Sequence, residues 1–169
     1  MTQEVKIFSG IIGFTVLLVV VFAFWQGGKK SDAELYRNEL TSVVAKPESY
    51  ELGEVPINGG LVTKEYDLKN NSGTAAEIKN ISTSCMCTQA KAVRGGNETG
   101  FFGMEHPGDS NPAVDFEIPA GESVKIVVQF DPAAHGPTGT GPFDRTVRLN
   151  FSNPAGYKLL LFNGNVVSS

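Results

Sequence analysis

Apolar residues alternate with polar residues along several short stretches of this chain, and this two-residue period constrains the fold more than any other feature. The period is clearest in Ser123–Phe130 and Thr146–Phe151. Clusters of turn residues lie between such stretches, at Asn70–Gly73, Pro119–Glu122 and Ser152–Gly156. A half-buried strand has one apolar face that a second sheet must cover. The pattern therefore predicts an all-β domain built as a sandwich of two sheets.

Seven or eight strands are expected in this domain, which we assign to residues 48–169. They lie near residues 50–55, 60–69, 74–83, 87–93, 114–118, 122–130, 144–151 and 157–167. A chain of this size buries enough apolar surface to fold without disulfide staples. The two cysteines, Cys85 and Cys87, are too few for a disulfide framework and too close to close a useful loop.

A second feature precedes the sandwich. Residues Ile7–Trp25 are 19 residues without a charge, and a helix of that length rises about 28 Å, enough to span a hydrocarbon core. Trp25 and the cations that follow it suit a membrane interface. We expect a single transmembrane helix over residues 7–25, after a short tail of residues 1–6. A cleaved signal peptide and a buried soluble helix are the alternatives.

Residues 26–47 read as a linker or a short helix. Ser31 is a possible helix cap, and apolar residues up to Ala45 fall near helical spacing. Pro47 would end such a helix, so the domain boundary is placed there.

Charge and composition exclude several classes of function. The chain carries 14 basic and 18 acidic residues, a net charge of −4, whereas a nucleic-acid-binding protein needs a basic face. It has two histidines and no serine in a nucleophile-elbow pattern. We expect neither nucleic-acid binding nor catalysis.

Several segments together resemble a known family. Tyr66–Gly73, Ser84–Thr88 and Pro119–Glu122 are similar to the patterns F-x-L-x-N-x-G, S-C-G-C-T and P-G-E of a largely bacterial family of domains of unknown function, numbered fifteen seventy-three. The resemblance covers about Leu52–Val167. Met86 stands where the family has glycine between its cysteines, and the segment Arg94–Ala113 is longer than a strand connection needs.

The resemblance implies an immunoglobulin-like sandwich, related to modules of ciliary and centrosomal scaffold proteins, that often follows a signal or a membrane anchor. It implies no settled activity. It also favours an extracytoplasmic carboxy-terminal domain held at the cell membrane, although the cations flanking Ile7–Trp25 do not by themselves favour export.

The cysteine pair is the first candidate for chemistry. Residues two apart on a strand point the same way, so Cys85 and Cys87 could bind one soft metal ion such as Cu(I). Met104 and His106, in the inserted segment, supply the other ligand types that copper prefers. In the competing interpretations the cysteines are small buried hydrophobes, form a local or intermolecular disulfide, or perform thiol redox chemistry.

His135 lies in a glycine- and proline-rich loop, Asp131–Pro142. A surface loop is the simpler interpretation. A ligand role for His135 requires that the fold bring it beside Cys85.

Three functions follow from these observations. The leading hypothesis is a membrane-anchored, non-catalytic immunoglobulin-like module that binds a protein or another component of the cell envelope. The first alternative is copper or other soft-metal binding through Cys85, Cys87, Met104 and His106. The second is thiol redox chemistry at the two cysteines.

Overall fold

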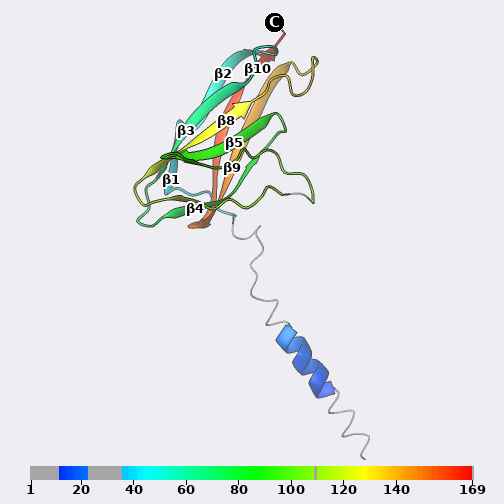
Figure 1. Cartoon of the computed structure of the whole chain (residues 1–169). Coiled ribbons are helices and arrows are strands. Elements are labelled where there is room, and N and C mark those ends of the chain that lie inside the picture. Colours follow the sequence, from blue (N-terminus) through cyan, green and yellow to red (C-terminus); the bar gives the residue numbers. More distant parts are fainter. Residues whose placement is uncertain (1–11, 23–35, 109, 169) are drawn as a thin grey trace, which may run out of the picture. The chain divides into compact units, whose positions relative to one another are not determined.

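The computed structural model describes residues 12–22, 36–108 and 110–168. The chain divides into two units, Met1–Leu35 and Tyr36–Ser169. In the first unit, residues 12–22 form an α-helix (Figure 1). Among the described residues, no helix has the length and apolar content needed to cross a bilayer. The two ends of the expected span Ile7–Trp25 fall outside the described residues, so the membrane anchor stays a prediction.

The second unit consists of two five-stranded sheets (Figure 1). The first sheet contains, in spatial order, β1 (Val43–Lys46), β3 (Val62–Asn70), β8 (Ser123–Phe130), β5 (Thr88–Arg94) and β6 (Asn97–Glu98). The second contains β2 (Ser49–Pro56), β10 (Ala155–Val167), β9 (Gly141–Asn153), β4 (Ala76–Thr83) and β7 (Phe116–Ile118). Neighbouring strands are antiparallel, except that β2 runs parallel to β10.

The strand order is that of an immunoglobulin-like sandwich. Constant-type immunoglobulin domains place strands A, B, E and D in one sheet and C, F and G in the other. The order β1-β3-β8-β5 follows the first pattern and β4-β9-β10 follows the second. The initial strand is split, because β1 joins one sheet and β2 joins the other. The predicted all-β, two-sheet architecture is therefore confirmed.

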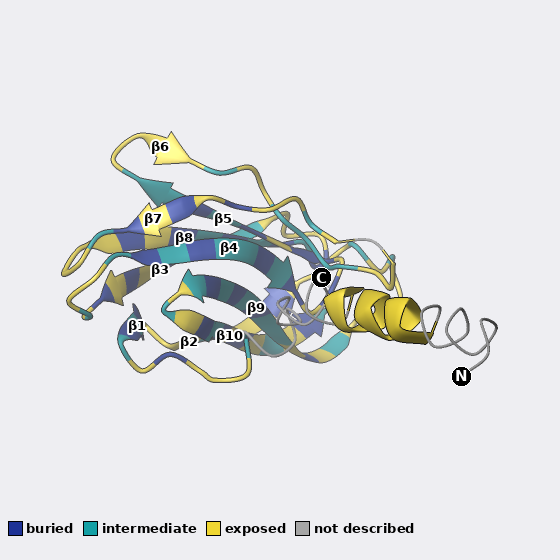
Figure 2. Ribbon diagram, turned by 90° about the horizontal axis from the view of Figure 1, so that it is seen from below, coloured by how far each residue is buried: buried dark blue, intermediate teal, exposed yellow. Residues whose placement is uncertain are grey.

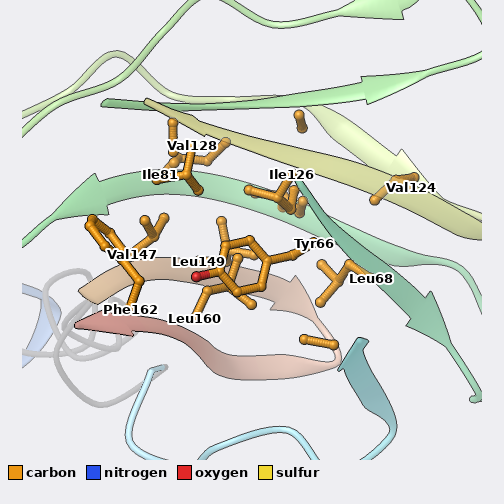
Figure 3. Close-up of a cluster of buried hydrophobic side chains, with 14 of the residues drawn as sticks. Tyr66, Leu68, Ile81, Val124, Ile126, Val128, Val147, Leu149, Leu160 and Phe162 are labelled. Carbon is orange, nitrogen blue, oxygen red and sulfur yellow. The ribbon is translucent and has the colours of Figure 1, made fainter. Parts of the chain in front are cut away.

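The core lies between the two sheets, where the alternating apolar residues meet. Buried and exposed positions alternate along the strands in Figure 2, and β8 buries Val124, Ile126, Val128 and Phe130. Figure 3 shows side chains from both sheets gathered in this core. Polar contacts also join the two sheets: the Tyr66 hydroxyl on β3 donates a hydrogen bond to the Leu161 carbonyl on β10 at 2.6 Å, and Nδ2 of Asn70 on β3 donates to the Ile118 carbonyl on β7 at 2.9 Å. The two-residue period thus does place one face of the longer strands inside.

The strand count and the domain boundary differ from the sequence prediction. The described residues form ten strands, because β1 and the two-residue β6 were not among the seven or eight expected. The predicted linker or helix over residues 26–47 is wrong at its carboxy-terminal end, where β1 pairs with β3. Val43 and Ala45 are buried, and a run of four residues is too short for a period of two to stand out from helical spacing.

The chain joins the sandwich even before β1. Leu40 is buried, and its N–H donates to the Tyr157 carbonyl at 2.8 Å. Tyr157 in turn donates its N–H to the Asn38 carbonyl at 2.9 Å. The sandwich therefore begins near Tyr36 rather than after Pro47. Residues 26–35 of the predicted linker lie outside the described part of the chain.

Candidate functional site

The two cysteines lie in the turn that connects β4 to β5, one strand from each sheet. The Thr88 N–H donates to the Cys85 carbonyl at 3.1 Å, and the Thr83 hydroxyl lies 3.0 Å from the carbonyls of both Cys85 and Thr88. Both thiols are free, with 9% of Cys85 and 3% of Cys87 exposed. Met86 between them is 62% exposed and has no left-handed backbone conformation. The turn therefore does not require the glycine that stands there in the family it resembles.

A second loop, between β8 and β9, brings a histidine to this turn. The Asp131 N–H donates to the Cys87 carbonyl at 2.8 Å and so ties the two loops together. Asp131 also orders its own loop, because its side chain accepts the Ala133 N–H at 2.9 Å. As a result, Nε2 of His135 lies 3.2 Å from Sγ of Cys85. His135 is exposed, whereas both thiols are buried.

Cys85, Cys87 and His135 form one compact cluster of donor atoms. The two sulfurs and a ring nitrogen of His135 all lie within 4.8 Å of one another. The Cys87 N–H also points at Sγ of Cys85, at 3.4 Å. The condition under which His135 could act as a ligand is therefore met.

Arg145 on β9 completes the surroundings of the thiols. Its Nε donates to Sγ of Cys87 at 3.3 Å, and its Nη1 donates to the Asp144 carbonyl at 2.8 Å. The guanidinium carbon lies 5.8 Å from the centre of the Phe143 ring. A cavity of about 330 Å³ lies beside the cluster and is lined in part by His135 and Arg145.

Arg145 belongs to this site but was not predicted from the sequence, although a signal for it is present there. Arg145 occupies the same alternate positions of β9 as Phe143, Val147 and Leu149, all of which are buried. A cation in the core-facing register of an otherwise apolar strand needs a partner. Here the partner is a thiol.

The surroundings shift the pKa values of the two thiols in opposite directions. Burial opposes ionisation of Cys85, but hydrogen bonds from the Cys87 thiol, the Cys87 N–H and His135, together with the charge of Arg145, outweigh it and lower the pKa of Cys85 to about 7. Burial and the hydrogen bond given to Cys85 raise the pKa of Cys87, against the effects of Arg145 and Thr88. Cys85 is therefore the thiol that ionises first.

The other two predicted ligands lie in the inserted segment between β6 and β7. Met104 is half-buried and His106 is exposed. Hydrogen bonds of Asn111 fix this segment, because its Nδ2 lies 2.9 Å from the carbonyls of both Ile81 and Gly103. Among the described residues, the histidine that joins the cysteines is His135 and not His106. Of the predicted histidine ligands, His106 therefore lies outside this cluster, and a ligand role for Met104 stays a prediction.

The chain was compared with known proteins. No family model matches it, and no curated protein matches its sequence. Among solved structures it is similar to a protein of unknown function from Porphyromonas gingivalis W83, with a TM-score of 0.53 and 12% identity, covering 75% of this chain and 49% of that one. It is also similar to a family 123 glycoside hydrolase from Clostridium perfringens, with a TM-score of 0.52 and 7% identity, covering 76% of this chain and 28% of that one.

A third similar structure is the ASH/PapD-like domain 7 of human CEP192, with a TM-score of 0.44 and 14% identity, covering 83% of this chain and 91% of that one. The chain spans about half or less of the length of the two bacterial proteins. At these identities the likeness to the bacterial proteins concerns the β-sandwich fold alone. Membership of the family with the Cys-x-Cys-Thr signature stays a prediction.

Proposed function

We propose that this protein is a non-catalytic β-sandwich module that binds one soft metal ion through Cys85, Cys87 and His135. The observation that carries the proposal is the convergence of two sulfurs and an imidazole nitrogen within 4.8 Å. Thiolate ligands select soft ions such as Cu(I), and imidazole is a suitable third ligand. Metal–sulfur and metal–nitrogen bonds of about 2.0–2.3 Å separate neighbouring ligand atoms by roughly 3.5–4 Å. The cluster needs only a small adjustment to reach that spacing.

The surroundings of the sulfurs favour this function over a purely structural role. A small buried hydrophobe packs against apolar atoms, whereas Cys85 faces an imidazole nitrogen and Cys87 faces a guanidinium. These polar groups come from a loop and a strand distant in sequence. The imidazole and the guanidinium both favour the negative charge that a metal-bound cysteine must carry, and at Cys85 these neighbours help to outweigh the effect of burial.

We further propose that residues 7–25 tether the module to a membrane and that the sandwich lies outside the cytoplasm. The support is the uncharged run Ile7–Trp25 and the resemblance of the sandwich to a largely bacterial family whose domains often follow a signal or a membrane anchor. A tether confines the module near envelope components and raises its effective concentration there. A protein or another envelope component is then the expected partner, to which the module would present its metal ion.

The test is a titration of the full-length protein with Cu(I), under reducing and anaerobic conditions, against a coloured Cu(I) chelator. We expect one Cu(I) per chain. Cys85→Ser and His135→Ala should each weaken binding by more than the roughly 10–100-fold typical of changes outside the ligand shell.

The inserted segment supplies a matched control for this titration. His106→Ala should leave the Cu(I) affinity unchanged, because His106 is not part of the cluster. Absence of Cu(I) uptake, or a loss of affinity in His106→Ala equal to that in His135→Ala, would overturn the proposal.

A further inference from the structure

We infer that Arg145 makes this site selective for a monovalent soft ion of the Cu(I) class over Zn²⁺. The inference rests on the proposed function and adds to it the charge of the ion and the residue that selects it. Nε of Arg145 lies 3.3 Å from Sγ of Cys87, so the guanidinium touches a ligand atom directly.

The position of Arg145 is fixed from two sides. Its Nη1 donates to the Asp144 carbonyl, and its guanidinium faces the Phe143 ring. In the β9–β10 ladder Arg145 pairs with Phe162, which is buried. Arg145 therefore contacts the thiol from a paired strand and not from a flexible loop.

Among the described residues, no carboxylate forms a salt bridge with Arg145, so its positive charge acts on the thiols. Within the described part of the chain, the salt bridges of other basic residues pair Lys79, Lys91, Arg94, Lys125 and Lys158 with carboxylates, and Arg145 is not among them. Asp131, the acidic residue of the loop between β8 and β9, accepts the Ala133 N–H with its carboxylate. Arg145 therefore acts as a fixed positive charge beside the ligand sulfurs.

The net charge of the occupied site differs between a monovalent and a divalent ion. With metal bound, both cysteines are thiolates and the histidine is neutral, so the ligands carry two negative charges. A monovalent ion and Arg145 together neutralise these two charges. A divalent ion neutralises them alone and leaves the guanidinium charge uncompensated. Both thiols are buried, and excess charge costs more where water screens it less.

The number of ligands favours the same ion. Structural zinc sites almost always have four protein ligands, whereas the described residues bring three cysteine and histidine donors together here. Thiolate ligands suit both Cu(I) and zinc, so the number of ligands, and not their type, distinguishes the two ions. Coordination and charge thus point to the same class of ion by independent arguments.

The experiment compares Cu(I) and Zn²⁺ binding by the full-length protein, each measured against a chromophoric chelator. Arg145→Gln should weaken Cu(I) binding and narrow the preference for Cu(I) over Zn²⁺ by at least about tenfold. Arg145→Lys keeps the positive charge and should retain most of the preference. Arg94→Gln is the control, because Arg94 pairs with Glu122 on the surface and should leave both affinities unchanged.

The outcomes separate the inference from the proposed function. If the wild-type protein binds neither ion, the proposed function fails and the inference fails with it. If it binds Cu(I), but Arg145→Gln weakens both ions equally, the site stands and the role of Arg145 is overturned. Loss of the preference in a folded Arg145→Lys variant, checked by circular dichroism, would also overturn it, because the charge has been kept.

Discussion

At the scale of single residues, the two thiols differ in their neighbours although they lie two positions apart. Sγ of Cys85 accepts the Cys87 N–H and faces His135, whereas Sγ of Cys87 accepts from Nε of Arg145 and contacts the Thr88 hydroxyl. The cysteine pair could be singled out from sequence, because its spacing is visible there. The identity of its neighbours could not, because His135 and Arg145 reach it only through tertiary packing.

The thiols of the metal-free protein should titrate separately. Because the pKa of Cys85 is lowered to about 7 and that of Cys87 is raised, raising the pH through 7 should ionise the first thiol and leave the second protonated. Thiolate absorbance near 240 nm measures this directly. Cys85→Ser should remove the early step and Cys87→Ser should keep an early step. A single step for both thiols in the wild-type protein, at the pH of an ordinary cysteine, would contradict the assignment.

Asn70 has a structural role that a substitution can test. Its buried side chain donates to the carbonyls of Thr74 and Ile118 at 2.8 and 2.9 Å and accepts the Ser72 N–H at 3.0 Å. Asn70→Ala leaves these backbone groups without their partner and should lower the free energy of unfolding by about 3 kcal/mol. Chemical denaturation measures the loss. The exposed neighbour Asn71 provides the control, and an equal effect of Asn71→Ala would refute this role.

At the scale of elements, all eight strands expected from the alternation are present, and the errors are confined to short segments. β1 has four residues and β6 has two, which is too short for a periodic pattern to be read. The segment before β1 could not be predicted either. Single hydrogen bonds and one buried leucine hold it to the sandwich, and these leave no periodic pattern in the sequence. The position of this segment depends on Gly156 of β10, and no sequence pattern marks the role of that glycine.

Gly156 allows this segment to approach the β9–β10 hairpin. A Cβ atom added at Gly156 would lie 2.6 Å from the Asn38 carbonyl oxygen and 2.6 Å from Cδ2 of Leu40. Gly156→Ala should therefore displace the segment and cost about 1–3 kcal/mol of stability, measured by thermal or chemical unfolding. Gly73→Ala is the matched control, because nothing lies within 4 Å of its added Cβ. Equal stability of the two variants would show that the segment does not need this close approach.

At the scale of the whole molecule, the sequence predicts a membrane-spanning segment and a β-sandwich domain. The structure tests only the prediction of the sandwich. The two-sheet fold could be predicted because nearly every strand repeats the same alternation. The site could be predicted only in part. It combines residues of two loops with Arg145 of β9, and no local sequence pattern shows that these segments lie together. The sequence favours His106 because it lies two positions from Met104 in the inserted segment. In the structure, the hydrogen bond from the Asp131 N–H to the Cys87 carbonyl holds the loop of His135 beside the cysteines instead.

The proposed tether makes its own prediction. The full-length protein should sediment with membranes and resist extraction at alkaline pH, because residues 7–25 would be held by the hydrocarbon core. A chain lacking residues 1–28 should be recovered in the soluble fraction with its Cu(I) affinity intact. Extraction of the full-length protein by alkali would contradict the anchor and leave the metal site unaffected.

The most direct test of the central claim is X-ray absorption at the copper edge of the Cu(I)-loaded, full-length protein. The spectrum should fit two sulfur ligands and one nitrogen ligand, and His135→Ala should remove the nitrogen while His106→Ala keeps it. A copper shell without nitrogen in the wild-type protein, or a nitrogen that survives His135→Ala, would contradict the claim that Cys85, Cys87 and His135 hold the ion.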